Sequence, residues 1–413
     1  MNKVIMLCMA LTLALFANSQ QETGIRFDHE HNWSQILAQA KKENKLIFVD
    51  AFTTWCGPCR FMSKNIFPLK EVGDFYNEHF IMVKAQLDTS KSDNDYVKAH
   101  YADFAAIGTT YKVRAYPTYL IINGDGQLVH KFLGSMPAPE FLAKGKDAIN
   151  PDKQLYAMLD KFNKGERDPQ FLLDLTRISE AAYEPALQAR AFDAWTSTQT
   201  DLLSEKNIPI LFEFTNSSQD KGFPLLQANA ARVDAVVGAG KTAQKMKEIA
   251  IQETIAPAIA RTGNTSPDFD AIHTSLVKQY PAQADELTAY AKVAYAQQTQ
   301  NWPAFQTNIV AYMAKYCNNC NPAELNEYAW TVFENCKDKD CLEKALAWSQ
   351  MSFEKNQEPG MMDTYANLLY KLGRTNEAIR VEEKALALAD EGDKKGYQEV
   401  IDKMKKGEKT WKE

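Results

Sequence analysis

Two of the seven cysteines, Cys56 and Cys59, form a Cys-x-x-Cys motif in the first part of the 413-residue chain. The motif follows an apolar run, Leu46 to Phe52, and precedes a helical pattern, which predicts that Cys56 lies at the start of a helix. Unpaired amide groups and the helix dipole stabilise a thiolate at that position. The two intervening residues bring the second sulfur, one turn along, within reach of the first. The pair therefore predicts dithiol–disulfide exchange, with a thiolate nucleophile and a resolving thiol.

The two residues between the cysteines, Gly57 and Pro58, bear on the direction of that exchange. Pro58 suits the first turn of a helix, where its missing N–H leaves no hydrogen bond unmade. Neither residue is basic or a histidine, so nothing between the cysteines adds to the stabilisation of a Cys56 thiolate. This composition favours a less acidic Cys56 and a reducing rather than a strongly oxidising pair.

The elements that must position the motif occur in the order helix, strand, helix, strand, helix, hairpin, helix over residues 25–150. Apolar runs predict four strands, Leu46–Phe52, Phe80–Leu87, Thr118–Ile122 and Leu128–Leu133. The turn Asn123-Gly124-Asp125-Gly126 is typical of a hairpin between the last two. A last helix is expected from about Pro139 to Ile149. This order predicts an α/β domain.

The segment Trp55-Cys56-Gly57-Pro58-Cys59 is identical to the thioredoxin active-site pentapeptide, and the chain resembles the thioredoxin superfamily over residues 25–150. The resemblance implies a thioredoxin fold, which an all-α region follows here. It also implies that Trp55, Gly57 and Pro58 contact substrate around the Cys56–Cys59 dithiol. No dissociable cofactor is expected.

Residues elsewhere in the domain extend the resemblance. Asp50, six residues before Cys56, matches the buried acid that assists deprotonation of the second cysteine in the family. The segment Tyr116-Pro117-Thr118 matches the loop whose proline is cis and whose backbone pairs with a substrate strand. Lys84 falls where thioredoxins place a lysine beneath the site, and Gly134 where they keep a glycine near the substrate groove.

Two features depart from a minimal thioredoxin. The segment from Asp88 to Val113 is longer and includes a polar run. Tyr116 before the proline is more typical of protein disulfide isomerase domains, which carry histidine where this chain has Pro58. The inner dipeptide therefore favours a reductase, whereas the proline loop leaves a disulfide oxidase or isomerase open. A third alternative is a non-catalytic adaptor whose thioredoxin-fold domain only docks partners.

A secretory signal peptide is predicted over residues 1–19. Lys3 is followed by an apolar run from Val4 to Ala17 and by small residues before Gln20. The run is shorter than the roughly 20 residues that span a bilayer. The mature protein is therefore expected to be exported, periplasmic or secreted, without stable membrane insertion, in a compartment where disulfides persist.

Composition and compartment define the expected partners. A formal net charge of −6 gives no sign of a basic surface, so nucleic-acid binding is not expected. The predicted reductase acts on disulfide-containing protein clients. A site that stays reduced outside the cytosol needs an external source of electrons, and the resemblance implies a membrane thiol-reductant donor.

The rest of the chain is predicted to be helical, with a linker or domain over 151–265 and repeats over 266–413. Three similar segments begin at Tyr290, Tyr328 and Tyr365, and each precedes a second helix. Their spacing resembles that of tetratricopeptide repeats (TPR), which stack into concave docking surfaces. The second helices carry small residues seven apart: Ala304 and Ala311, Ala345 and Ser352, Ala378 and Ala385. We therefore expect TPR-like hairpins in which these small residues let the helices approach closely.

Four further cysteines, Cys317, Cys320, Cys336 and Cys341, lie within these hairpins. In an exported protein they are candidates for structural disulfides, which could pair locally or crosswise. Their spacing also approaches a four-cysteine zinc pattern, and free or redox-active thiols are the other alternative. The disulfide interpretation is preferred, and no metal ligand is assigned.

Overall fold

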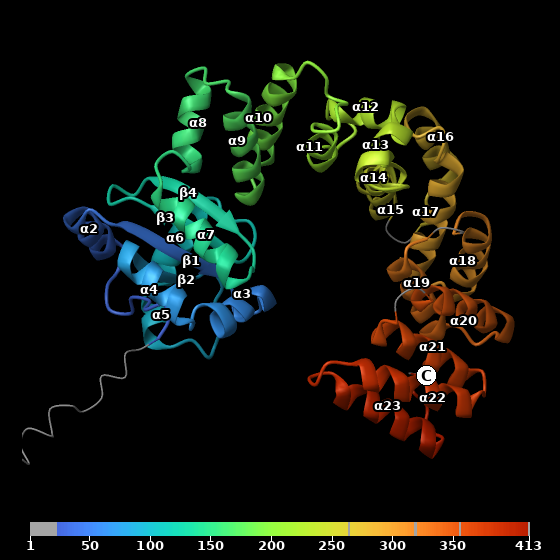
Figure 1. Ribbon diagram of the computed structural model, residues 1–413. Coiled ribbons are helices and arrows are strands. Elements are labelled where there is room, and N and C mark those ends of the chain that lie inside the picture. Colours follow the sequence, from blue (N-terminus) through green and yellow to red (C-terminus); the bar gives the residue numbers. More distant parts are fainter. Residues whose placement is uncertain (1–22, 263–264, 318–319, 355–356, 412–413) are drawn as a thin grey trace, which may run out of the picture. The chain divides into compact units, whose positions relative to one another are not determined.

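The computed structural model describes residues 23–262, 265–317, 320–354 and 357–411. The predicted signal peptide, residues 1–19, lies outside the described residues. The chain divides into two compact units between Ser204 and Glu205 (Figure 1). The first unit is mixed α/β, and the second consists of helices, so the predicted fold class is confirmed. None of the helices in the described part of the chain is both long and apolar enough to cross a membrane.

A four-stranded sheet organises the first unit, with the strand order β2-β1-β3-β4. The strands are β1 (Leu46–Phe52), β2 (Phe80–Gln86), β3 (Thr118–Ile122) and β4 (Leu128–Leu133). Strands β1 and β2 are parallel, and the other two pairs are antiparallel. The predicted strands are therefore present, although β2 ends one residue earlier than expected. The Gly126 N–H donates to the Asn123 carbonyl in the predicted hairpin turn between β3 and β4.

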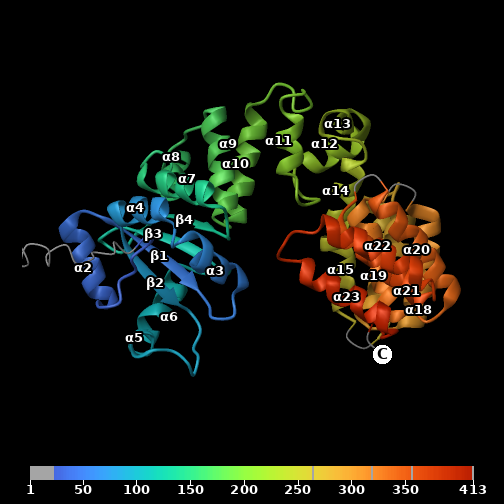
Figure 2. The same cartoon turned by 60° about the horizontal axis from the view of Figure 1, so that its bottom comes forward.

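Helices cover both faces of this sheet (Figures 1 and 2). Alternate residues of β1 point to opposite faces, so Phe48 joins one apolar cluster and Ile47 joins the other. The Phe48 cluster includes residues of α4 (Lys70–His79) and α7 (Ala138–Ile149). The Ile47 cluster includes residues of α2 (Trp33–Glu43) and α6 (Tyr101–Thr110). Burial on both sides explains why β1 is a nearly continuous apolar run rather than an alternating one.

Three helices beyond residue 150 belong to the same unit. They are α8 (Leu155–Asn163), α9 (Pro169–Ala181) and α10 (Pro185–Thr198). The Leu155 N–H donates to Nδ1 of the buried His130 on β4, at 3.1 Å. Burial lowers the pKa of His130 to about 4, so its ring is neutral and can accept this hydrogen bond at neutral pH. The compact unit therefore extends past residue 150, where the thioredoxin-like domain is predicted to end.

The second unit begins with shorter helices and continues as helical hairpins. Its first part contains α11 (Ile208–Glu213), α12 (Gly222–Ala228), α13 (Ala230–Val237), α14 (Lys241–Ala250), the π-helical η2 (Ile251–Ile255), α15 (Ala256–Ala260) and α16 (Phe269–Gln279). Three hairpins follow. They are formed by α17 (Ala284–Gln298) with α18 (Trp302–Tyr316), by α19 (Pro322–Asn335) with α20 (Lys339–Phe353), and by α21 (Pro359–Lys371) with α22 (Thr375–Leu388). The helix α23 (Lys394–Lys406) comes after them. Their assignment as tetratricopeptide repeats stays a prediction.

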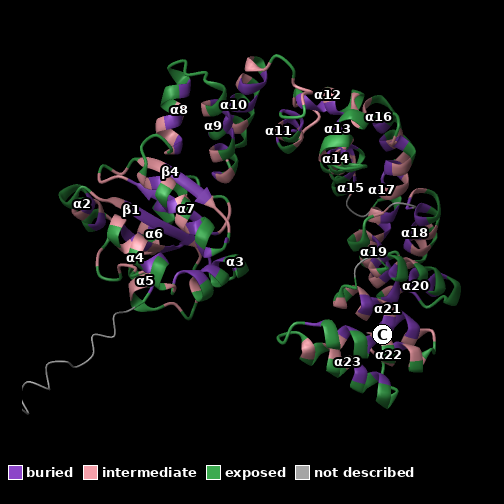
Figure 3. Cartoon of the chain, in the orientation of Figure 1, coloured by how far each residue is buried: buried purple, intermediate pink, exposed green. Residues whose placement is uncertain are grey.

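Small residues lie buried where these hairpin helices pack. Figure 3 shows that buried and exposed stretches alternate along these helices. The alanines of the three Tyr-Ala dipeptides, Ala291, Ala329 and Ala366, are fully buried in the first helix of each hairpin. In the second helices, the pairs of α20 and α22 are buried as expected. Ala311 of α18 differs, because it is exposed. The other small residue of α18, Ala304, is half-buried and packs against the apolar cluster of the second unit.

Two carboxyl groups lie next to each other between α21 and α22. Glu382 is fully buried, and its carboxyl group lies within hydrogen-bonding reach of the Asp363 carboxyl group. Asp363 accepts a hydrogen bond from Asn367 at 2.9 Å. Burial, and then the charge of Asp363, raises the pKa of Glu382. The folded protein therefore retains a proton here that the unfolded chain releases at neutral pH.

Replacing Glu382 by glutamine is expected to stabilise the protein by about 1–3 kcal/mol at pH 8 and much less at pH 4. An acid whose pKa is raised by folding makes the protein less stable as the pH rises above the group's ordinary value. Glutamine cannot ionise, so the variant does not lose this stability as the pH rises. Urea unfolding of the full chain at both pH values measures the difference. The exposed Glu343→Gln is the matched control, and an equal response of both variants contradicts the prediction.

Candidate active site

The Cys-x-x-Cys motif lies at the start of α3 (Gly57–Phe61), as predicted. Cys56 is the N-cap residue, and the two cysteines form a disulfide with their Cα atoms 5.3 Å apart. The backbone N–H of Cys59 donates to the sulfur of Cys56 at 3.1 Å, and Pro58 occupies the first turn. An amide that points at the Cys56 sulfur also stabilises a thiolate there once the disulfide is reduced.

The turn before Cys56 is held by two residues that the sequence analysis did not single out. Asp88 lies two residues after the end of β2, and its carboxylate accepts hydrogen bonds from the backbone N–H of Thr54 at 3.0 Å and from the Thr54 hydroxyl at 2.5 Å. Arg60 of α3 donates to the Thr54 carbonyl at 3.1 Å. Because the carboxyl ends of the parallel strands β1 and β2 meet at one edge, the position of Asp88 in the sequence was a usable signal.

The proline loop lies beside the motif. The Tyr116–Pro117 peptide bond is cis, and the ring of Tyr116 contacts the ring of Trp55 edge-on, with 5.7 Å between the centroids. The Gly134 N–H donates to the Pro117 carbonyl at 3.0 Å, and the Thr118 hydroxyl donates to the Ala115 carbonyl at 2.7 Å. These two hydrogen bonds fix the backbone before and after the cis peptide bond.

The surface around the motif is open. Trp55 is 67% exposed although it is a large apolar side chain. A Cβ atom on Gly57 or on Gly134 would meet no other atom within 4 Å. The disulfide itself is largely covered, since Cys56 and Cys59 are both buried. A substrate strand thus has free surface beside the sulfur atoms, bounded by an exposed aromatic ring.

Asp50 lies on β1, on the sheet face that the helices following the motif cover. Its carboxyl group is fully buried, and its Oδ1 atom has no hydrogen-bond partner among the described residues. Burial raises the pKa of Asp50 to about 7, and the nearby Lys84 ammonium partly opposes this rise. Lys84 is the register partner of Asp50 on β2, and its ammonium group donates to the Ser63 hydroxyl at 2.8 Å. Asp50 can therefore bind or release a proton near neutral pH.

The helical stretch predicted after the motif is present, but it is not α-helical throughout. A π-helical turn, η1 (Met62–Ile66), follows α3, and the Phe67 N–H donates to the Met62 carbonyl at 2.9 Å. Its buried residues, Met62 and Ile66, both enter the Phe48 cluster. With this wider turn both side chains fill the core, and Cys56 is the N-cap of α3.

The four distal cysteines have two different states. Cys317 and Cys320 form a disulfide with each other, which is the local pairing, at the end of α18. Cys336 and Cys341 depart from the expected structural disulfide, because they are buried free thiols. The Cys336 thiol donates to the Asp338 carbonyl at 3.7 Å, and a hydrogen bond with Cys341 lowers its pKa. The described residues contain no cluster of ligands that could hold a metal ion, so the zinc alternative receives no support.

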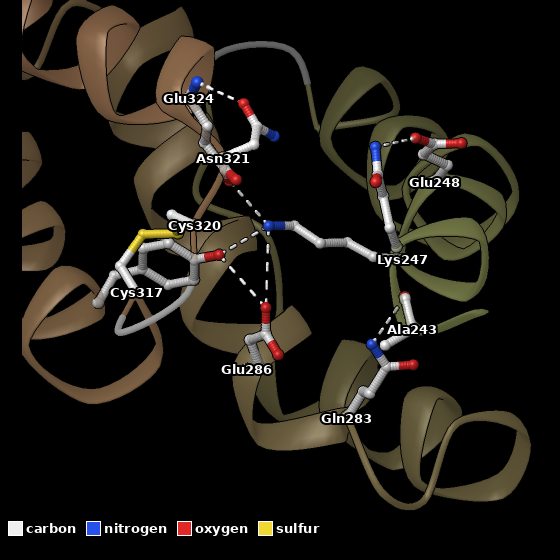
Figure 4. Close-up of polar contacts among 11 residues, drawn as sticks. Ala243, Lys247, Glu248, Gln283, Glu286, Cys317, Cys320, Asn321 and Glu324 are labelled. Atoms are coloured by element: carbon white, nitrogen blue, oxygen red, sulfur yellow. Dashed lines mark hydrogen bonds and ion pairs between the residues drawn. A yellow bond between two sulfur atoms is a disulfide. The ribbon is translucent and has the colours of Figure 1, made fainter. Parts of the chain in front are cut away.

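The Cys317–Cys320 disulfide lies near a polar cluster centred on Lys247 of α14 (Figure 4). The Lys247 ammonium donates to the Glu324 carboxylate at 2.9 Å and to the Tyr312 hydroxyl at 2.8 Å. It also lies 3.8 Å from a carboxylate oxygen of Glu286. These contacts join α14 to three hairpin helices. The cluster is a packing feature of the second unit, because its groups already satisfy one another.

Comparison with known proteins agrees with the geometry of the first unit. A family model described as a thioredoxin-like domain matches residues 33–149. A thioredoxin-like protein of Synechocystis is 31% identical over 111 residues, which are 27% of this chain and 86% of that protein. Chloroplastic thioredoxin Y of Oryza sativa is 29% identical over 113 residues, 27% of this chain and 56% of that protein. The chain therefore belongs to the thioredoxin superfamily.

Among solved structures, a putative disulphide-isomerase from Bacteroides thetaiotaomicron is 37% identical. The match covers 31% of this chain and 95% of that chain, with a TM-score of 0.26. A structure described as DsbH oxidoreductase is 18% identical, with 33% and 92% covered and a TM-score of 0.27. The chain spans about half the length of the first curated relatives it matches.

Proposed function

We propose that this protein is a thiol–disulfide oxidoreductase that reduces disulfides in client proteins. The observation that carries the proposal is the Cys56–Cys59 disulfide at the first turn of α3, beside the cis Tyr116–Pro117 bond and the exposed Trp55. A dithiol at a helix N-terminus, next to open surface on which a client strand can lie, has the parts that disulfide exchange requires.

The reaction proceeds in two exchange steps. The Cys56 thiolate attacks one sulfur of a client disulfide, which forms a mixed disulfide and releases the other client sulfur as a thiolate. Cys59 then loses its proton to Asp50 and attacks the Cys56 sulfur. The client leaves with two thiols, and the Cys56–Cys59 disulfide is restored. Two electrons pass to the client, so each cycle requires a reductant, for which we propose a membrane thiol donor.

The other parts of the proposal concern place and docking. We propose that residues 1–19 direct export and that the protein acts in the periplasm or outside the cell, where client disulfides persist. The helical hairpins from α17 to α22 would dock clients or the reductant donor. The packed Tyr-Ala positions of the first hairpin helices support a repeated unit of this kind.

The equilibrium reduction potential of the Cys56–Cys59 pair tests the direction of the reaction. We expect a value near −270 mV, the thioredoxin figure, because Gly57 and Pro58 add no positive charge to the thiolate. Titration of the signal-free protein in glutathione or dithiothreitol buffers measures it. A Cys56→Ala, Cys59→Ala protein is the control, since any transition that it retains belongs to the distal cysteines.

The potential also decides between the proposed reductase and a second function. Tyr116 before the cis-proline is the feature that favours a disulfide oxidase or isomerase. A potential of about −180 to −120 mV would support that function and contradict the reductase.

A further inference from the structure

A cavity of about 730 Å³ lies in the first unit. Its walls come from the end of α6 and the segment after it, from β3 and β4, from α8, and from α10 with the turn that precedes it. We call it the lateral groove. Its volume is within the range of about 300–1,000 Å³ that is usual for ligand sites. One wall comes from residues beyond 149, where the match to the thioredoxin-like family ends, so the groove depends on helices outside that match.

The lateral groove reaches the proline loop. Arg114, two residues before Tyr116, lines it, and so does Thr118, which directly follows Pro117. Leu133 of β4 pairs with Thr118 and also lines the groove. A polypeptide that lies along the Tyr116–Pro117 loop therefore has the groove beside it on the same unit.

The groove carries an excess of positive charge. Four basic residues and one acidic residue line it: Lys112, Arg114, Lys131, Arg190 and Glu184. The Lys131 ammonium, largely buried, pairs with the Glu184 carboxylate at 2.6 Å, so these two charges offset each other. Arg190 donates to the neutral Asn163 side chain at 3.2 Å and forms no ion pair with a residue that the structure describes.

Two of the basic side chains are available to a ligand. Lys112 and Arg114 are exposed, and neither forms an ion pair or a side-chain hydrogen bond with any residue that the structure describes. They lie at positions 112 and 114, on the segment that leads from α6 to the proline loop. A negatively charged group on a bound chain would therefore meet unpaired cations on the segment that leads to the cis-proline loop.

Aromatic rings mark the same place. Tyr111, Tyr156 and Tyr183 line the groove, and Tyr183 is 62% exposed. Tyr183 and Lys112 each lie just past the end of a helix, where a φ of +53° turns the chain away from the helix axis. The exposed ring of Tyr183 offers apolar surface to a ligand.

We propose that the lateral groove binds an acidic, extended segment of the client polypeptide next to its disulfide cysteine. Aspartate and glutamate side chains would pair with Lys112 and Arg114, while apolar parts of the segment pack on the tyrosines. Clients with acidic residues near the disulfide are thus preferred. This proposal rests on the proposed function, because the same client strand contacts Cys56.

Binding of cysteine-free peptides tests the groove without any redox step. Fluorescein-labelled peptides of equal length, with either four glutamates or four lysines among serine and leucine, are titrated with the full-length oxidised protein. Fluorescence anisotropy at low salt is expected to show about tenfold tighter binding of the acidic peptide. The preference should shrink in 0.5 M salt, because the cations are exposed.

Charge-reversal variants test whether the preference for the acidic peptide arises from Lys112 and Arg114. A Lys112→Glu, Arg114→Glu protein is expected to lose the acidic preference. Lys146→Glu is the matched control for a change of charge, because Lys146 is exposed on α7, which covers the opposite face of the sheet. Tyr183→Ala should weaken binding of both peptides. Equal binding of the two peptides by the native protein, or an equal response of the double variant and the control, overturns the proposal.

Kinetics separate this proposal from the proposed function. Disulfide-bridged versions of the peptides should show the same preference in kcat/KM. If the protein reduces both peptides equally well, the groove proposal fails and the oxidoreductase stands. If it reduces neither peptide but still binds the acidic one more tightly, the oxidoreductase fails and the groove stands.

Discussion

Replacing Cys56 by serine is expected to abolish disulfide reduction, with a loss of at least about 1,000-fold in kcat/KM. Cys56 is the N-cap of α3 and receives the Cys59 amide hydrogen bond at its sulfur, so it is the thiol whose ionised form the helix favours. A serine hydroxyl at this position is not a nucleophile toward sulfur at neutral pH. Reduction of insulin or of a bridged peptide, with dithiothreitol as the electron source, measures the loss.

The Cys59→Ser variant should fail in a different way. It retains the nucleophile, so the first exchange still occurs, but no thiol remains to resolve the mixed disulfide. A covalent adduct of protein and client is therefore expected to accumulate, and mass spectrometry detects it. Adducts on the Cys56→Ser protein instead would show that the two roles are reversed.

The second Cys-x-x-Cys pair provides the matched control. A Cys317→Ser, Cys320→Ser protein lacks the other disulfide of the same spacing, which lies in the second unit. We expect it to retain reductase activity, because the described residues of the second unit contain no cis-proline loop. A comparable loss of activity in this protein would contradict the assignment of catalysis to the first pair.

Replacing Asp50 by asparagine is expected to slow the release of client from the mixed disulfide by about 10- to 100-fold at pH 7. Asp50 is fully buried, and burial raises its pKa to about 7, which suits a group that must take a proton from a thiol and pass it on. The ionised form is the base. The rate of release in the native protein should therefore rise with pH through about 7, and this rise should be absent from the variant.

Rapid-quench measurement of the preformed mixed disulfide between pH 5.5 and 8.5 tests this expectation. Attack by Cys56 on the client should change little, so the first exchange serves as an internal reference. Glu78→Gln, an exposed change of the same type on α4, is the matched control. If the release rates of the native protein and of Asp50→Asn depend on pH in the same way, Asp50 does not act in the resolving step.

The same substitution should also change stability. Because folding raises the pKa of Asp50 from 3.8 to about 7, the native protein loses stability as the pH rises between these values. The difference corresponds to about 4 kcal/mol at pH 8, as an upper limit. The asparagine variant should therefore be the more stable protein at pH 8 and gain little at pH 4. Urea unfolding of the oxidised protein distinguishes this gain from a simple loss of packing.

The amino-acid sequence by itself determined the elements and the central chemistry of the first unit. The apolar runs of β1, β3 and β4 predict strands with the observed ends, because both faces of the sheet are buried and local composition reflects that burial. The spacing of Cys56 and Cys59, with Pro58 between them, predicts a helix start, because capping acts within one turn. These properties depend on neighbours along the chain.

Tertiary structure alone decided the features that join distant residues. Asp88 holds the turn before Cys56 from across 34 positions, and Lys84 lies beside Asp50 only because β1 and β2 are paired in parallel. Spacing also left the pairing of the distal cysteines open. Cys317 and Cys320 form a disulfide, whereas the Cys336 thiol donates a hydrogen bond to the Asp338 carbonyl. The lateral groove exists because α8 and α9 pack beside β4 and α10 packs on α9. The sequence pattern of one segment does not determine which other segment will cover it.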